Sequence, residues 1–162
     1  MTGLYDAWQR QVNYLRISVT DHCNLNCVYC SAGQIVHLPR HQVLSYEEIQ
    51  RVVQVAASMG INKVRLTGGE PLLRADLSEL VAMVARINGI DDISLTSNGV
   101  LLHYQAKELK KAGLNRVNVS LDTLKADRFR RITGQDRLGE VLSGIETARN
   151  AGLNPVKINM VV

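Results

Sequence analysis

The sequence predicts an α/β fold in which about five parallel strands alternate with four outer helices. The first reason is a joint that occurs four times, where a glycine ends a helix and a strand begins about four residues later. The joints start at Gly60, Gly89, Gly113 and Gly152. Glycine suits the left-handed position after a helix because it has no Cβ atom to clash. The second reason is that apolar and polar residues alternate along every expected strand.

The expected elements follow one another from residue 16 to the last residue. A first strand covers residues 16–20, and a last strand covers residues 156–162 with no helix after it. The first two helices begin at capping boxes, in which paired side chains satisfy free N–H groups. The boxes are Ser45 with Glu48 and Asp76 with Glu79. Apolar residues then recur at helical spacing in four stripes. The stripes are Ile49, Val52, Val53, Ala56 and Met59; Leu77, Leu80, Val81, Val84 and Ile87; Leu102, Ala106 and Leu109; and Leu138, Val141, Leu142, Ile145 and Ala148.

One face of the expected sheet is polar, although parallel sheets are normally covered and apolar on both faces. The apolar side chains expected to face the helices are Leu15, Ile17, Val19, Val64, Leu66, Ile93, Leu95, Val117, Val119, Leu121, Val156, Ile158 and Met160. The polar side chains opposite them are Arg16, Ser18, Thr20, Arg65, Thr67, Ser94, Thr96, Asn118, Ser120, Asp122, Lys157 and Asn159. We interpret this pattern as an incomplete (βα) barrel whose lumen is a wet, polar binding chamber. An open sheet that faces solvent is the alternative.

Three cations belong to the polar face, namely Arg16, Arg65 and Lys157, and Asp122 is the one carboxylate expected beside them. Unpaired charge is costly to remove from water. A polyanionic ligand such as a phosphate chain is therefore the natural counter-charge.

The composition is that of an ordinary soluble globular chain of 162 residues, with a formal net charge of +4 and 46% hydrophobic residues. No stretch reaches the roughly 20 apolar residues that a membrane helix needs, and no signal peptide is visible. A cytoplasmic location is expected. The densest basic run is Lys125, Arg128, Arg130 and Arg131. We interpret it as a solvated helix face rather than a nucleic-acid patch, because Phe129 is its one candidate partner for stacking on bases.

All three cysteines, Cys23, Cys27 and Cys30, lie within eight residues. The odd count and the cytosolic context disfavour a disulfide framework. Clustered thiolates suit a soft metal centre instead. A [4Fe–4S] cluster ordinarily takes four cysteines, so three would leave one iron open for another ligand. A Cys₃His zinc site is the alternative, with a fourth ligand from His22, His37 or His41.

A Cys-x₃-Cys-x₂-Cys loop after the first strand, with Tyr29 before the last cysteine, resembles the radical S-adenosylmethionine (SAM) superfamily. The segment Gly68-Gly69-Glu70-Pro71 resembles the glycine-rich motif that contacts the SAM amino group in this superfamily. The resemblance implies that the three thiolates hold a [4Fe–4S] cluster and that SAM chelates its open iron. It also implies an external electron donor and a single partial-barrel domain over residues 1–162.

Other segments resemble the GTP 3′,8-cyclase family of molybdenum-cofactor biosynthesis, whose members are lyases. They are residues 15–21, 65–74, 96–99, 117–122 and 156–159. This resemblance implies SAM contacts at Tyr29, Gly69 and Ser120. It implies GTP contacts at Arg16, Arg65, Thr96 and Lys157. A 5′-deoxyadenosyl radical would abstract a ribose hydrogen from GTP, and no catalytic side chain is expected because the cofactor carries this chemistry.

The sequence departs from that family at several positions. Ser31 and Ala32 follow the third cysteine where Met-Pro is usual, and His22 stands where arginine is common. No further cysteine is present for the second cluster that the family carries near its C-terminus. We therefore expect the chain to be the N-terminal part of such an enzyme, truncated before the second-cluster region, that binds cluster and SAM without cyclising GTP. A radical SAM enzyme with another substrate is the alternative. Membrane and nucleic-acid partners are not expected, whereas a homodimer is compatible with the sequence.

Overall fold

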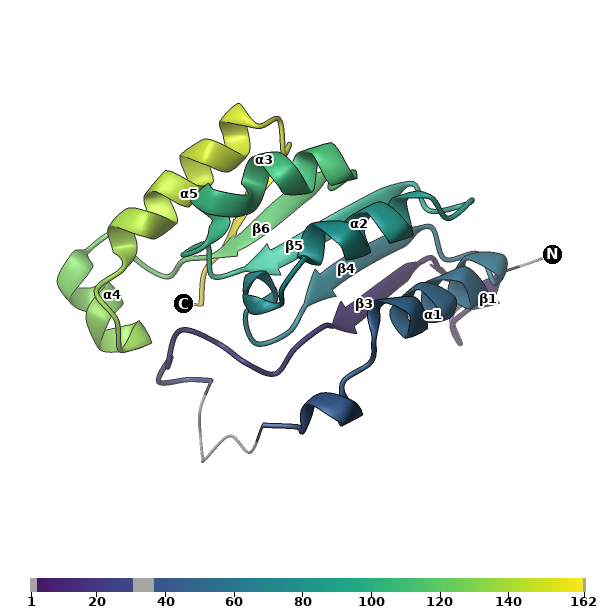
Figure 1. Cartoon of the computed structure of the whole chain (residues 1–162), viewed down its shortest axis with the longest axis horizontal. Helices are drawn as coiled ribbons and strands as arrows, with labels where there is room; N and C mark the ends of the chain where they lie inside the picture. Colours follow the sequence, from purple (N-terminus) through teal and green to yellow (C-terminus); the bar gives the residue numbers. More distant parts are fainter. Residues whose placement is uncertain (1–2, 31–36, 162) are drawn as a thin grey trace.

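A computed structural model of the chain describes residues 3–30 and 37–161. Its centre is a five-stranded parallel sheet in the order β3-β4-β5-β6-β7 (Figure 1). The strands are β3 (Tyr14–Ser18), β4 (Lys63–Thr67), β5 (Asp92–Ser97), β6 (Arg116–Ser120) and β7 (Val156–Asn159). The α/β class and the five parallel strands are thus confirmed. Within the described residues the sheet stays open, with β3 and β7 as its edges.

Four helices lie side by side along one face of the sheet (Figure 1). They are α1 (Tyr46–Ser58), α2 (Leu77–Ala85), α3 (Leu102–Ala112) and α5 (Leu138–Asn150). Two 3₁₀ turns, η1 (Arg40–Gln42) and η2 (Pro71–Leu73), precede α1 and α2. None of the described helices has the length and apolar character needed to cross a membrane.

The joints between helices and strands have the predicted geometry. The four glycines have positive φ angles of 96° at Gly60, 93° at Gly89, 114° at Gly113 and 79° at Gly152. Each following strand begins three or four residues later. Because this turn is the same each time, all these strands begin at the same end of the sheet. The loops of variable length follow their carboxyl ends, at the opposite end.

One of the two predicted capping boxes is confirmed. The Ser45 hydroxyl accepts the Glu48 N–H at 3.2 Å, and the Glu48 carboxylate accepts the Ser45 N–H at 2.7 Å. The box at Asp76 is wrong, because Asp76 has left-handed backbone angles (φ 56°, ψ 34°) and makes no side-chain cap. An N-cap residue needs an extended backbone to turn its side chain toward the free N–H groups.

The core lies between the sheet and the helices, as the alternation predicts. Val64, Leu66, Leu95, Val117 and Val119 are all fully buried. β7 departs from the prediction, because it ends at Asn159 rather than at 162, and Ile158 and Met160 are 48% and 57% exposed. In the described part of the chain α5 packs against β7, and only Val156 of this strand packs against the core. β3 likewise begins two residues earlier than predicted, at Tyr14.

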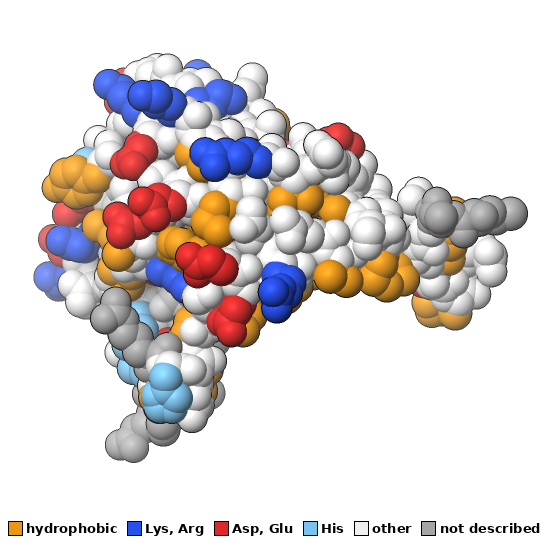
Figure 2. Space-filling model, turned by 45° about the vertical axis from the view of Figure 1, so that its right-hand side comes forward, with side chains coloured by type: hydrophobic (Ala, Val, Ile, Leu, Met, Phe, Trp, Pro, Cys, Tyr) orange, Lys and Arg blue, Asp and Glu red, His pale blue; other side chains and the backbone are white. Residues whose placement is uncertain are grey.

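Two local elements were not predicted. One is a hairpin of β1 (Leu4–Tyr5) and β2 (Gln11–Val12), whose strands are too short to show a period. Apolar side chains are exposed around it, at the right of Figure 2. The other is α4 (Ala126–Thr133), which buries Phe129. Its basic side chains are exposed, which fits the predicted solvated face, and the preference for that face over a nucleic-acid patch stays a prediction.

Candidate functional site

The three cysteines lie in the loop that follows the carboxyl end of β3. Cys23 and Cys30 are exposed and Cys27 is half-buried. The middle of the loop is held on α4, because the Asn26 and Val28 N–H groups each donate, at 2.9 Å, to carbonyl oxygens at the end of that helix. The Cys30 N–H donates to the Cys27 carbonyl oxygen at 2.9 Å and closes a turn around the last two thiols. α4, which sequence periodicity missed, therefore positions the cysteine loop.

Two thiols have distinct surroundings. Burial raises the pKa of the Cys27 thiol, with smaller contributions from the neighbouring Cys30 and Cys23. The Asn98 amide, at the end of β5, donates to the Cys23 sulfur at 3.8 Å and to the Asn24 side-chain oxygen at 2.7 Å. Asn98 thus connects the first cysteine of the loop to the end of β5. Asn98 was missed as a site residue, although it lies in the Thr-Ser-Asn-Gly segment.

Tyr29 connects the cysteine loop to the end of β6. Its hydroxyl donates to Asp122 Oδ2 at 2.7 Å, while Asp122 Oδ1 accepts the Val161 N–H at 2.9 Å. Burial, followed by the bond to Asp122, raises the pKa of Tyr29 far above its usual range, so the phenol stays protonated. Tyr29, Ser120 and Cys27 line one small cavity together with Asp122. The structure thus brings together two of the three residues implied as SAM contacts.

Gly69, the third of those residues, lies against the backbone that leads into the cysteine loop. The Gly69 N–H donates to the Thr20 carbonyl oxygen and the Glu70 N–H donates to the His22 carbonyl oxygen, both at 2.7 Å. A Cβ atom on Gly69 would collide with the His22 carbonyl oxygen. The close approach that requires glycine is therefore between two protein backbones.

Glu70 is fully buried beside these glycines, where sequence reasoning gave it no role. Its carboxylate accepts the Leu72 N–H at 3.0 Å, the Ser97 hydroxyl at 2.8 Å and the Asn98 N–H at 2.7 Å. Burial raises the pKa of Glu70, and these three donors oppose that rise. Glu70 thus fastens the loop after β4 to the end of β5.

The residues implied as GTP contacts share the face of the sheet opposite the helices. Arg16 pairs in register with Arg65, and Thr96 and Lys157 both pair with Asn118. The Arg65 Nε donates to the Ser94 hydroxyl at 3.3 Å, and its guanidinium lies 5.2 Å from the Tyr14 ring centre. Within residues 3–30 and 37–161, no carboxylate lies within 4.0 Å of the Arg16, Arg65 or Lys157 nitrogens.

The polar face also holds groups that the sequence interpretation left out. Arg116 pairs in register with Ser94 and forms a two-point ion pair with Asp92. Asp92 neutralises the charge of Arg116, so Arg16, Arg65 and Lys157 are the cations that remain to bind an anion. Asn118 Oδ1 is buried and accepts no hydrogen bond from the described residues, so a polar ligand on this face would satisfy it.

The thiol set fits an iron–sulfur cluster better than a zinc ion. A tetrahedral zinc ion about 2.3 Å from each thiolate holds the sulfurs about 3.8 Å apart. Among the described side chains, the three thiols form no group within 4.8 Å of one another, whereas Asp21, His22 and His37 do. Two of the three candidate fourth ligands for zinc thus face Asp21. The three thiols therefore do not form a ready zinc set, whereas three thiolates on one loop would leave one position open in a four-iron cluster.

The chain is similar to known sequences over nearly its whole length. The chain is 56% identical over 160 residues to the GTP 3′,8-cyclase of Pelotomaculum thermopropionicum, covering 98% of this chain and 49% of that protein. It is 51% identical over 159 residues to the GTP 3′,8-cyclase of Thermodesulfovibrio yellowstonii, covering 97% and 49%. The chain therefore spans about half the length of these curated relatives.

Solved structures share the fold at low sequence identity. The hydrogenase maturase HydG superposes with a TM-score of 0.74 at 20% identity, over 91% of this chain and 34% of HydG. Streptococcus suis SuiB bound to S-adenosylmethionine gives 0.76 at 20% identity, over 91% and 33%. The model of the radical SAM superfamily matches residues 17–162, a span that runs from β3 through the cysteine loop to β7. The chain belongs to the radical SAM superfamily.

Proposed function

We propose that this chain binds a [4Fe–4S] cluster and SAM and forms part of an enzyme that starts the cyclisation of GTP. The observation that carries the proposal is the position of the cysteine loop. The loop follows the carboxyl end of β3, and its Cys27 lines one cavity with Ser120 and Asp122. The polar face of that sheet carries cations that have no carboxylate partner among the described residues. The high identity to GTP 3′,8-cyclases over half their length supports the choice of substrate.

Cys23, Cys27 and Cys30 would hold the cluster, and Tyr29, Gly69 and Ser120 would contact SAM. When bound, the cluster and SAM supply a 5′-deoxyadenosyl radical by reductive cleavage, which abstracts a ribose hydrogen of GTP. The chain's own part is to position the reactants and to exclude water. The bond from Tyr29 to Asp122 holds the cysteine loop at the end of β6 for this purpose.

Arg16, Arg65 and Lys157 would bind the triphosphate of GTP, and Thr96 would add a neutral hydrogen bond. Arginine suits phosphate because its planar guanidinium donates two parallel hydrogen bonds. Arg65 is already oriented by Ser94 and by the Tyr14 ring, so it loses less side-chain freedom when an anion binds. An external reductant and a cytoplasmic location belong to this proposal, as does the absence of a nucleic-acid partner.

The cofactor site is tested by electron paramagnetic resonance of the anaerobically reconstituted, dithionite-reduced chain. We expect a [4Fe–4S]⁺ signal that changes when SAM is added. Cys23→Ser should lose most of the signal, while Ser143→Ala on the exposed face of α5 should keep it. A sample that holds zinc and gives no signal, or a signal that ignores SAM, would contradict the proposal.

The substrate site is tested by equilibrium binding of GTP to the same sample. Arg65→Ala should weaken binding roughly 10- to 150-fold, because a charged hydrogen bond contributes roughly 1.5–3 kcal/mol. Lys107→Ala on the exposed side of α3 is the matched control and should bind as the wild type does. We expect no 3′,8-cyclised GTP from residues 1–162 alone, and its detection would show that this part of the enzyme suffices.

A further inference from the structure

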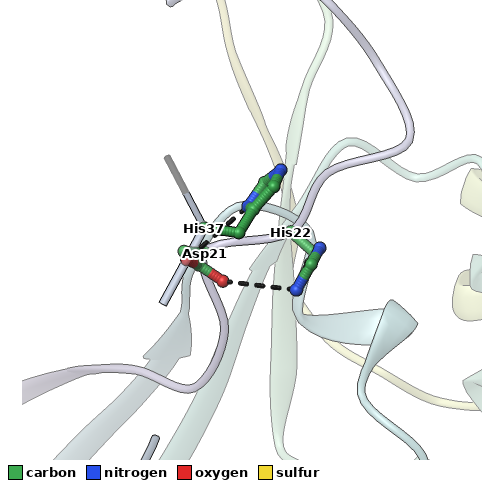
Figure 3. A group of neighbouring side chains, drawn as sticks. All are labelled: Asp21, His22 and His37. Atoms are coloured by element: carbon green, nitrogen blue, oxygen red, sulfur yellow. Dashed lines mark ion pairs between the residues drawn. The ribbon is translucent and has the colours of Figure 1, made fainter. Parts of the chain in front are cut away.

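A second group of potential metal ligands lies at the start of the cysteine loop. The Asp21 carboxylate lies 3.7 Å from His22 Nε2 through Oδ1 and 3.5 Å from His37 Nδ1 through Oδ2 (Figure 3). The ligand atoms of the three residues all lie within 4.8 Å of one another. Figure 2 shows histidine side chains gathered at the bottom of the view, on the outside of the molecule. None of the three residues has a place in the proposed SAM or GTP sites.

The backbone fixes two of these ligands firmly. The Gly69 N–H bonds to the Thr20 carbonyl and the Glu70 N–H to the His22 carbonyl, so the segment with Asp21 and His22 is held on the loop after β4. Gly69 also touches this segment so closely that no larger residue fits. A metal site built on such a segment needs little reorganisation before it binds.

The third ligand is brought in by a separate contact. The Leu38 N–H donates to Asp21 Oδ2 at 2.6 Å, which sets His37 beside the carboxylate. The His22 and His37 rings stack with centroids 4.1 Å apart and planes inclined by 14°. The Arg74 guanidinium donates to the carbonyl oxygens of Val19 at 2.7 Å and Leu44 at 2.6 Å, which anchors the chain on both sides of the cysteine loop.

The free atoms of this group match the needs of a transition metal. Asp21 Oδ1 is buried and accepts no hydrogen bond from the described residues. Two imidazoles and one carboxylate are the ligands that bind Zn²⁺, Co²⁺, Ni²⁺ or Fe²⁺ with positions left open. A tetrahedral ion about 2.1 Å from each ligand atom separates neighbouring ligand atoms by about 3.4 Å. Each nitrogen lies within a few tenths of an ångström of that separation from one carboxylate oxygen, His22 Nε2 at 3.7 Å from Oδ1 and His37 Nδ1 at 3.5 Å from Oδ2.

We propose that Asp21, His22 and His37 bind a divalent transition-metal ion, separate from the centre held by the cysteines. This ion connects residues 21–22 to residue 37 and so joins the two ends of the segment that carries Cys23, Cys27 and Cys30. Closing a loop in this way removes conformational freedom from the unfolded chain. The ion thus acts as a structural clip for the cysteine segment, and its binding does not depend on the function proposed above.

The test is a Co²⁺ titration of the whole chain after its thiols have been alkylated, followed by absorption spectroscopy. We expect one equivalent of Co²⁺ to bind with a spectrum typical of nitrogen and oxygen ligands and without a thiolate charge-transfer band. Because loss of even an outer-shell partner weakens metal sites roughly 10–100-fold, His37→Ala should weaken binding by about tenfold or more. His41→Ala is the matched control, since His41 is exposed, lies four residues further on and is outside the group. It should leave the affinity unchanged.

Circular dichroism shows whether each variant is folded. A second measurement needs no variant and so holds even if His37→Ala fails to fold: it uses the wild-type chain with alkylated thiols. One equivalent of Cu²⁺ should give a resonance spectrum with coupling to two imidazole nitrogens. The proposal is overturned if Co²⁺ gives no saturable signal, if His37→Ala and His41→Ala bind it equally, or if Cu²⁺ shows no nitrogen coupling. Because the thiols are blocked throughout, a failure of the cluster proposal cannot produce these results.

Discussion

Glu70 is the residue whose surroundings differ most from those of an ordinary carboxylate on a protein surface. It is fully buried, and its two oxygens accept three hydrogen bonds from the loop after β4 and from the end of β5. Both loops contribute to the cysteine site, the first through Gly69 and the second through Asn98. Glu70 therefore positions Asn98, whose N–H it binds directly and whose side-chain amide reaches Cys23.

Glu70→Gln is expected to lower the free energy of unfolding by about 1–3 kcal/mol, because the new amide NH₂ must face a hydrogen-bond donor. Urea unfolding followed by circular dichroism measures the loss. Glu146→Gln, on the exposed side of α5, is the matched control and should change stability by less than about 0.5 kcal/mol. Equal effects of the two substitutions would show that the buried hydrogen bonds contribute nothing.

The same residue predicts a pH dependence. Burial raises the folded-state pKa of Glu70 above its unfolded value. Its contribution to stability is then complete below the unfolded pKa of about 4.3 and is lost as the pH rises through the folded pKa. The glutamine variant has no such group, so the penalty of Glu70→Gln should shrink between pH 5 and pH 8. A penalty that grows over this range would contradict the raised pKa.

At the scale of elements, the loop after β4 and the loop after β3 are packed backbone against backbone. Gly69→Ala should destabilise the chain by about 1–3 kcal/mol, because its Cβ has no space beside the His22 carbonyl. Gly139→Ala, in the first turn of α5, has no atom within 4 Å of the new Cβ. It should instead stabilise the chain by about 0.5–1 kcal/mol through helix propensity. Thermal unfolding of both variants distinguishes steric from conformational effects.

The cysteine loop is tied to two elements, α4 and the end of β6. Tyr29→Phe removes the hydrogen bond to Asp122 and keeps the ring. In a reconstituted chain we expect the cluster absorbance to decay several-fold faster in the presence of a chelator, with little change in overall stability. Tyr104→Phe, at a side chain that is 75% exposed, should decay as the wild type does. Equal rates of decay in the two variants would mean that the hydrogen bond from Tyr29 to Asp122 does not hold the loop.

The elements that sequence periodicity found are those with a repeated pattern. The glycine joints and the apolar stripes follow directly from helix and strand geometry, so the four outer helices and five strands were predictable. α4 was read only as a charged face, because its eight residues bury just Phe129 and Thr133. The cap expected at Asp76 failed because residue type alone does not reveal a left-handed backbone.

For the molecule as a whole, the sequence predicted which side chains share a face better than it predicted their partners. Arg16, Arg65, Thr96 and Lys157 share one face because the strand period fixes their direction. The ion pair of Arg116 with Asp92 was missed, because pairing across strands depends on register, which no single strand encodes. Asp122 was expected beside the cations but bonds to Tyr29 instead, a contact between residues 93 positions apart.

Two guanidinium groups on neighbouring strands have a consequence for how the chain responds to its solvent. Arg16 and Arg65 lie opposite each other in the register, and like charges in such positions repel. Dissolved salt screens this repulsion, since the Debye length falls from about 30 Å at 0.01 M to about 10 Å at 0.1 M. The melting temperature should therefore rise with sodium chloride, and Arg16→Gln should abolish most of the rise while Lys107→Gln should not. Phosphate should raise the melting temperature further than chloride does at equal ionic strength. The stability measured for this protein therefore depends on the anion of the buffer.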